Sequence, residues 1–101
     1  MTSFNTRIEL HDASYQDYLN LHSHMAQEGY TTTIVANDGI TYHLPTAEYN
    51  LVANCTIAQA LEKAQRAAQK TRKRFAAVVS EYTSCHWAGL EQMRRAPARA
   101  Y

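Results

Sequence analysis

The chain has 101 residues, enough for one domain with a modest core and too few for two. Its hydrophobic content of 46% and charged content of 19% are ordinary for a soluble globular protein, and no apolar run is long enough for a membrane span or a signal-peptide core. We therefore expect a cytoplasmic protein with no membrane partner. Two cysteines, Cys55 and Cys85, are too few for a disulfide framework or a four-ligand zinc site, which predicts reduced thiols.

The formal net charge of +1 conceals an uneven distribution. Residues 1–50 contain one basic and six acidic side chains, a balance of −5, whereas residues 51–101 contain nine basic and three acidic side chains, a balance of +6. Such asymmetry favours either self-association of opposite surfaces or a basic patch that binds a polyanion. The alternative is that the fold interleaves the two halves and cancels the field.

The first two elements are predicted to be a strand and a helix. Residues 4–11 alternate between apolar and polar side chains, the pattern of a half-buried strand. Ser14 and Asp17 have the spacing of a capping box, with Asp12 as a competing N-cap, and they predict a helix over about residues 15–27. Its apolar arc contains Tyr15, Tyr18, Leu21, His22, Met25 and Ala26. The position of His22 within this arc predicts a partly buried, hydrogen-bonded histidine.

A β-hairpin is predicted over residues 30–44. Five of the seven residues from 30 to 36 are β-branched, and residues 37–39, Asn-Asp-Gly, are turn formers. A three-residue loop of this kind usually forms a type I turn closed by a glycine bulge, which pairs Ala36 with Ile40. One face of the hairpin then carries Thr31, Thr33, Val35, Thr41 and His43.

The segment after the hairpin permits two arrangements. Either residues 40–44 and 48–54 form one interrupted third strand, or only one of them lies in the central sheet. Thr56 and Gln59 then predict the cap of a second helix, whose apolar stripe is narrow and made largely of alanine. Small residues of this kind permit close approach of a helix to a sheet.

The last predicted strand covers residues 75–82. Its middle is apolar on both faces, which predicts that both faces are covered. We place the boundary of a single domain, residues 1–82, at the end of this strand. Residues 83–101 form a basic tail, which Trp87 is expected to anchor on a partner or on the protein's own sheet, and whose end is expected to be mobile.

The order strand, helix, strand, strand, helix, strand, with right-handed crossovers, predicts an α+β ferredoxin-like sandwich, an antiparallel sheet with two helices on one face. In that topology the first two strands end at the same edge, where the fourth strand begins. One rim is therefore expected to gather His11, Asp12, Asn37, Asp38, Arg72, Lys73 and Arg74. The open face of the sheet is expected to show Asn5, Arg7, Glu9, His11, Thr31, Thr33, Thr41 and His43.

Three segments, FNTRIEL at residues 4–10, VANDG at 35–39 and TYHLPTAEY at 41–49, resemble the GhoS-like family of small ferredoxin-like proteins from bacteria and their phages. The named member of that family is the endoribonuclease antitoxin of a type V toxin-antitoxin pair, which cuts the messenger of its membrane toxin. The family fold is similar to that of the small nuclease-like subunit of CRISPR adaptation. The resemblance covers residues 4–82, contains no catalytic signature, and implies RNA binding with cleavage of single-stranded RNA.

The candidate catalytic residues are His11, Asp12 and Asp38. Related folds place an acidic residue after the first strand, where it can hold a metal ion at a symmetric dimer interface, so Asp12 could bind Mg²⁺; its alternative role is a helix cap. Imidazole groups transfer protons readily near neutral pH, so His11 could act as acid or base in cleavage through the 2′-hydroxyl, which needs no metal; its alternative is an ordinary surface residue. Asp38 is first a turn former and only then a second carboxylate.

The candidate RNA-binding residues are Arg7, His43, Arg72, Lys73 and Arg74. The last three lie at the end of the second helix, where cations also favour the helix dipole, and could contact phosphates. Arg94, Arg95 and Arg99 in the tail could add to them, and a solvated basic cluster is the alternative. The open face lacks the aromatic residues on which an RRM stacks bases.

Two functions are therefore expected from the sequence. The first is a homodimeric RNA-binding protein of phage or prophage type with endoribonuclease activity. The alternative is a non-catalytic, homo-oligomeric interaction module. The chain has no nucleophile elbow, P-loop or dinucleotide fingerprint, which argues against ordinary metabolic catalysis.

Overall fold

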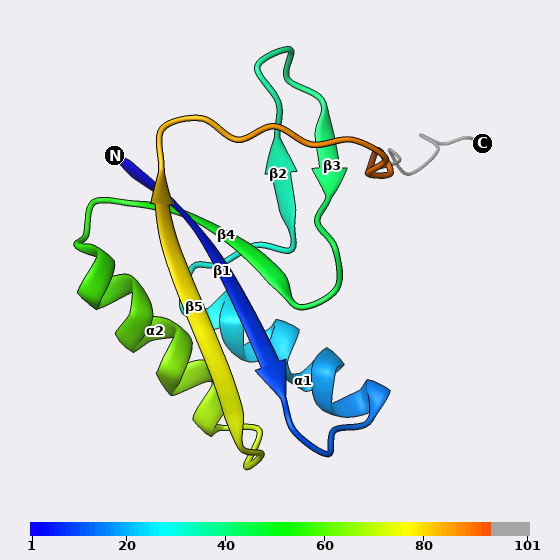
Figure 1. The fold of residues 1–101 in the computed structure, drawn as a ribbon, viewed down its shortest axis with the longest axis vertical. Coiled ribbons are helices and arrows are strands. Elements are labelled where there is room, and N and C mark those ends of the chain that lie inside the picture. Colours follow the sequence, from blue (N-terminus) through cyan, green and yellow to red (C-terminus); the bar gives the residue numbers. More distant parts are fainter. Residues whose placement is uncertain (94–101) are drawn as a thin grey trace.

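A computed structural model describes residues 1–93 of the chain (Figure 1). The elements are, in order, β1 (Thr2–Leu10), α1 (Tyr15–Gln27), β2 (Thr33–Val35), β3 (Thr41–His43), β4 (Glu48–Ala53), α2 (Ile57–Gln69) and β5 (Phe75–Tyr82). Strands β4, β1 and β5 form an antiparallel sheet in that order, with both helices packed on one face. This arrangement confirms the predicted ferredoxin-like α+β fold. Among the described residues, no helix is both long enough and apolar enough to cross a membrane.

Strand β4 supplies the third strand of the central sheet, which settles the choice between the two segments after the hairpin. It pairs with β1 so that Tyr49 lies opposite Thr6. Strand β3 pairs only with β2, in a separate two-stranded sheet. A single bridge joins the chain before β2 to the central sheet, with hydrogen bonds of 2.8 and 2.9 Å between the backbones of Thr31 and Asn50.

The β2–β3 hairpin has the predicted register. Val35 lies opposite Thr41, and the backbone N–H of Ala36 donates to the carbonyl oxygen of Ile40 at 2.8 Å. Gly39 has a φ of +86°, the left-handed conformation that the bulge requires. The hairpin extends away from the central sheet, however, and the tail crosses it (Figure 1). The expectation that its residues belong to the open face of the central sheet was therefore wrong.

Helix α1 begins and ends with local hydrogen bonds that its sequence predicts. The side chain of Ser14 accepts from the backbone N–H of Asp17 at 3.2 Å, and Oδ2 of Asp17 accepts from the backbone N–H of Ser14 at 2.8 Å. At the other end Gly29, at a φ of +96°, and Tyr30 donate to the last turn of the helix in a Schellman motif. Tyr15, predicted in the apolar arc, is 80% exposed in the first turn.

The core lies between the helices and one face of the sheet. Phe4, Ile8 and Tyr49 come from the sheet, and α2 meets them with four alanines that are fully buried: Ala60, Ala64, Ala67 and Ala68. The hydroxyl of Tyr30 accepts from Oγ1 of Thr6 at 2.8 Å and donates to the carbonyl oxygen of Ala60 at 2.9 Å. These bonds satisfy the hydroxyls of Thr6 and Tyr30 inside the core, and burial raises the pKa of Tyr30.

His22 is the partly buried, hydrogen-bonded histidine that the sequence predicts. Its Nδ1 lies 2.7 Å from the hydroxyl of Tyr49, and the two rings meet edge to face with centroids 5.5 Å apart. Burial lowers the pKa of His22 and raises that of Tyr49, because each charged form would lose hydration. Neutral His22 therefore fits this contact between α1 and β4.

The expectation that β5 is covered on both faces was wrong. The helices cover only the face that carries Phe75, Ala77 and Val79. On the open face Val78 is 64% exposed. Alanine and valine therefore occur on the partly buried face of β5 and on its exposed face, which is why composition alone did not distinguish the two faces.

Candidate functional site

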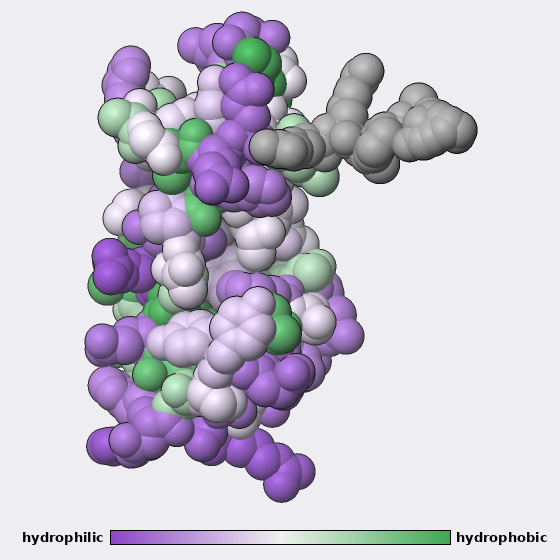
Figure 2. All heavy atoms as spheres, turned by 90° about the vertical axis from the view of Figure 1, so that its right-hand side faces the viewer, coloured by the Kyte–Doolittle hydropathy of each residue, from purple (hydrophilic) through white to green (hydrophobic). Residues whose placement is uncertain are grey.

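Two turns meet where β1 ends and β5 begins. The backbone N–H of His11 donates to the carbonyl oxygen of Arg74 at 2.8 Å, and Nζ of Lys73 donates to the carbonyl oxygen of Asp12 at 3.0 Å. We call His11, Asp12, Arg72, Lys73 and Arg74 the rim. It lies at the lower end of the molecule in Figure 1, and Figure 2, which keeps the same vertical axis, shows strongly hydrophilic surface there.

Both turns of the rim contain a residue other than glycine in the left-handed region. The φ of Asp12 is +52° and that of Arg72 is +62°. Aspartate accepts this conformation more readily than most residues, whereas arginine adopts it rarely. The N-cap of α1 is Ser14, so the helix-cap alternative for Asp12 was wrong. Asp12 is instead an exposed turn residue.

Lys73, predicted to bind RNA, is engaged within the rim. Besides its bond to the carbonyl oxygen of Asp12, its Nζ lies 3.7 Å from Oδ2 of Asp17. Hydrogen bonding from Ser14 lowers the pKa of Asp17, and the positive charge of Lys73 lowers it further. Lys73 thus holds the two turns together.

The guanidinium groups of Arg72 and Arg74 are the exposed cations of the rim. Within residues 1–93 neither forms an ion pair. Arg7 lies further along β1, on the open face, where its largely exposed side chain is 4.0 Å from Oε1 of Glu48. An ion pair so exposed contributes little to stability, so the guanidinium of Arg7 is also accessible.

Asp38 and His43 lie apart from the rim, at the hairpin end of the molecule (Figure 1). Oδ1 of Asp38 accepts from the backbone N–H of Ile40 at 3.0 Å, as a turn former does. The expectations that Asn37 and Asp38 join the rim, and that His43 shares a face with His11, were wrong. The reason is that the chain turns away from the central sheet after Thr31.

The acidic and basic halves of the sequence are partly interleaved. Arg66 on α2 donates from Nε and Nη2 to the two carboxylate oxygens of Glu28 at 3.2 and 2.9 Å, which lowers the pKa of Glu28. The pair of Lys73 and Asp17 also joins the two halves. Part of the charge asymmetry is therefore neutralised locally, and the exposed positive charge of the rim comes from its two arginines.

A magnesium site is not formed by the rim alone. Over the part of the chain that the structure describes, no three His, Cys, Asp or Glu side chains lie close enough to hold a metal ion. Asp12 offers one carboxylate, and bound Mg²⁺ takes its other ligands from water and substrate phosphates or from further protein oxygens. Among the described residues, the rim therefore offers a metal ion one carboxylate and not a set of three protein ligands.

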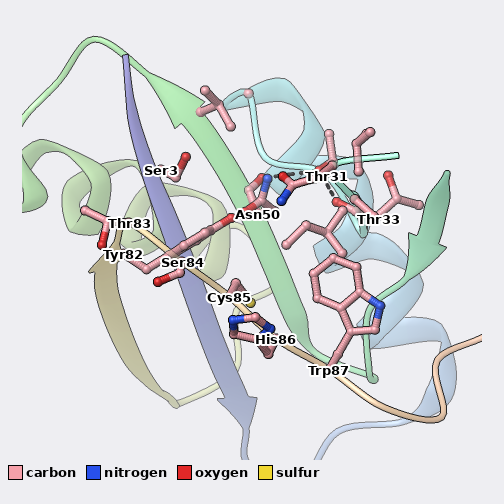
Figure 3. Close-up of a pocket in the computed structure, with 16 residues that line it drawn as sticks. Ser3, Thr31, Thr33, Asn50, Tyr82, Thr83, Ser84, Cys85, His86 and Trp87 are labelled. Atoms are coloured by element: carbon pink, nitrogen blue, oxygen red, sulfur yellow. Dashed lines mark hydrogen bonds between the residues drawn. The ribbon is translucent and has the colours of Figure 1, made fainter. Parts of the chain in front are cut away.

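A second site, a cleft of about 800 Å³, opens between the hairpin and the open face of the sheet (Figure 3). Its lining includes Ser3, Asn50 and Tyr82 from the sheet, Thr31 just before β2, Thr33 in β2, and Cys85, His86 and Trp87 from the tail. The ring of Trp87 packs edge to face on Tyr42, with centroids 5.4 Å apart. Trp87 thus anchors the tail on the hairpin. The sequence had singled out Trp87 and the hairpin face with Thr31 and Thr33, but it did not predict the cleft, which forms where the hairpin leaves the sheet.

Comparison of the chain with models of protein families finds no match, and comparison with curated proteins finds none. Three of the arginines expected to add phosphate contacts, Arg94, Arg95 and Arg99, lie outside the described residues, as does the end of the tail that was expected to be mobile. The two sites are therefore interpreted from their own geometry.

Proposed function

We propose that this protein binds single-stranded RNA through its rim. The observation that carries the proposal is a pair of exposed arginines, Arg72 and Arg74, in a turn that is bonded to the turn of His11 and Asp12. Guanidinium groups bind phosphate oxygens with two parallel hydrogen bonds and stay charged at any physiological pH. The backbone bond from His11 to Arg74 fixes the spacing of the two turns. A phosphodiester at the rim would meet two cations and an imidazole together.

Cleavage of the bound RNA is the second part of the proposal, and it draws on the GhoS-like resemblance. His11 would take the proton of a 2′-hydroxyl, whose oxygen then attacks the adjacent phosphorus and releases the 5′-oxygen as an alcohol, which takes its proton from water or a second acid. A protonated imidazole at the rim of a second copy in a homodimer would supply that acid. The product is a 2′,3′-cyclic phosphate, and a cytoplasmic location fits such a substrate.

A non-catalytic interaction module is the alternative function. Val52 and Val78, on the open face, are 53% and 64% exposed. Single exposed valines are common on protein surfaces, so they favour this alternative only weakly.

Binding is tested by fluorescence anisotropy of a labelled single-stranded RNA over a range of salt concentrations. The variant with Arg72→Ala and Arg74→Ala should bind on the order of tenfold more weakly. The slope of log K against log salt should fall by about 1.4, since each phosphate contact with a single strand contributes about 0.7. Lys63→Ala, which removes a cation from the middle of α2, is the matched control. Equal losses in the double variant and the control would contradict binding at the rim.

Cleavage is tested by incubating the same RNA with the protein, with and without EDTA. We expect a 2′,3′-cyclic phosphate product, formed equally in EDTA, and its loss in His11→Ala. Full cleavage by His11→Ala would show that the site assignment is wrong. If the wild-type protein neither binds nor cleaves RNA at low salt, the interaction module is the better interpretation.

A further inference from the structure

We propose that the cleft between the hairpin and the sheet is a binding site for an uncharged aromatic base, an unpaired nucleobase of the RNA that the rim holds. The inference rests on the proposed function for the source of the base. The site itself is argued from the chemistry of its lining and is tested separately with free nucleosides.

The lining of the cleft selects against charged ligands. None of its sixteen lining residues is Asp, Glu, Lys or Arg. Its polar groups are the hydroxyls of serine, threonine and tyrosine, the amides of two asparagines, and the rings of His86 and Trp87. A charged ligand would lose hydration there without gaining an opposite charge, whereas a neutral ligand with several donors and acceptors would exchange its water for these groups. The volume of about 800 Å³ is within the usual range for small-molecule sites.

The floor of the cleft is rigid and presents a hydrogen-bond donor. The hydroxyl of Tyr82 donates to Oδ1 of Asn50, whose backbone N–H and carbonyl oxygen are both bonded to the backbone of Thr31. Asn50 is only 8% exposed, so its amide has little freedom to turn. Oδ1 accepts from Tyr82 and the amide nitrogen can only donate, so Asn50 can offer a donor to a ligand. Burial raises the pKa of Tyr82, which keeps its hydroxyl protonated as the donor of this bond.

The tail provides an aromatic wall. Trp87 is partly buried and is held against Tyr42 of β3, while His86 beside it is exposed (Figure 3). Backbone bonds also hold the tail to β3, from His43 to Glu91 at 2.9 Å and from Met93 to Thr41 at 2.8 Å. Planar rings of this kind stack on bases of any sequence, because every base has an aromatic face. A donor on the floor and aromatic rings at the wall are the two groups that an unpaired base needs.

The position of the cleft agrees with an RNA strand that also reaches the rim. The two sites lie at opposite ends of β1, with Ser3 at the cleft and His11 at the rim. Arg7 lies between them on the open face of the sheet. A single strand along this face would place phosphates on the rim and on Arg7, and a base in the cleft.

Trp87 is the only tryptophan in the chain, so its fluorescence reports on the cleft directly. We expect a saturable change in this fluorescence on titration with uridine, cytidine, adenosine or guanosine, and none with ribose. Tyr82→Phe and His86→Ala should weaken that response on the order of tenfold. Ser80→Ala, which alters the open face outside the cleft, is the matched control and should respond as the wild type does. A response to ribose alone, a response unchanged in both cleft variants, or no response to any nucleoside would overturn the proposal.

A second measurement separates this inference from the proposed function. Binding of a labelled single-stranded RNA is compared with binding of an abasic strand of equal length. We expect the wild type to bind the strand with bases more tightly than the abasic strand, and Tyr82→Phe to bind both equally. Loss of Arg72 and Arg74 should lower the affinity for both strands by the same factor. If neither strand binds but nucleosides still change the fluorescence of Trp87, the cleft is a nucleobase site and the proposal of RNA binding at the rim is wrong. If both strands bind equally and an uncharged extended peptide alters Trp87 where nucleosides do not, the cleft is a peptide site.

Discussion

The central sheet and the β2–β3 hairpin are stabilised in different ways. The sheet joins strands that are distant in sequence, and its inner face is closed by two helices over fully buried side chains such as Phe4 and Tyr49. The hairpin joins neighbouring segments through a tight turn, and one backbone bridge, Thr31 with Asn50, connects it to β4. Its other support is the tail, through Trp87 and the bonds to β3.

This difference separates the two candidate sites. The rim belongs to the sheet, because its two turns connect β1 to α1 and α2 to β5. The cleft belongs to the boundary between the sheet and the hairpin. We therefore expect the rim to keep its geometry until the whole domain unfolds, while the cleft changes shape whenever the hairpin opens. Three perturbations test this division.

The largest effect is expected from Phe4→Ala. Phe4 is fully buried in the centre of the core, and truncation of such a side chain costs about 3–5 kcal/mol. Urea unfolding followed by far-ultraviolet circular dichroism should show this loss, and amide hydrogens of β1 and β5 should exchange faster. The amide of Ala36 bonds to Ile40 within the hairpin. If the hairpin opens locally, this amide should exchange at the same rate in Phe4→Ala as in the wild type.

The control for this substitution is Val78→Ala. It also shortens an apolar side chain in the sheet, but on the exposed open face, so the change in the free energy of unfolding should stay within about 0.5 kcal/mol. Faster exchange at Ala36 in Phe4→Ala, in proportion to the loss of global stability, would mean that the hairpin and the sheet unfold together.

The sequence predicted those features that short-range interactions determine. Ser14 and Asp17 sufficed to begin α1, and the Asn-Asp-Gly turn sufficed to pair Ala36 with Ile40. The meeting of His11 with Arg74 followed from the topology, because it depends only on strands that the core holds in place.

The position of the hairpin could not be predicted in the same way. A bend at Thr32 directs β2 away from the sheet, and nothing in a β-branched run shows where its pairing with a distant strand stops. For this reason Asp38 and His43 were assigned to the wrong surface, and the cleft was not foreseen. The burial of β5 was overestimated for a related reason, since valine suits both faces of a strand.

A smaller, reversible effect on the helix-covered region is expected from acid, through His22. Its pKa in the folded state is lowered by burial below the ordinary value of 6.5, so the neutral form is favoured by folding. The stability that this provides is fully present above pH 6.5 and is lost as the pH falls from there through the lowered pKa of the folded state. In the protonated ring Nδ1 can only donate, so the hydroxyl of Tyr49 would have to accept this bond.

The measurement is the free energy of unfolding between pH 8 and pH 5 for the wild type and for His22→Gln, which cannot titrate. We expect the wild type to lose stability relative to the variant across this range. Asp17 and Glu28, whose pKa values are lowered, lose their contribution in a separate window below about pH 5. Parallel pH profiles for the two proteins would show that the contact between His22 and Tyr49 does not favour neutral histidine.

The smallest effect is expected from Gly39→Ala, at the tip of the hairpin. A side chain there meets no atom within 4 Å, so the substitution tests only the positive φ of +86°. For alanine this conformation costs about 1 kcal/mol, whereas asparagine accepts it more readily. We expect the amide of Ala36 to exchange roughly fivefold faster in Gly39→Ala, as a cost of that size implies, and clearly less so in Gly39→Asn.

The urea midpoint distinguishes local from global effects of this turn. If the hairpin opens independently, it should already be open at the urea concentration at which the central sheet unfolds. The midpoint of Gly39→Ala should then equal that of the wild type, because the strained turn no longer contributes at that point. The Trp87 response to nucleosides should nevertheless weaken, since β2 forms one wall of the cleft. If the free energy of unfolding instead falls by the full cost of the turn, the hairpin unfolds together with the core. The cleft would then keep its shape until the whole domain unfolds, as the rim does.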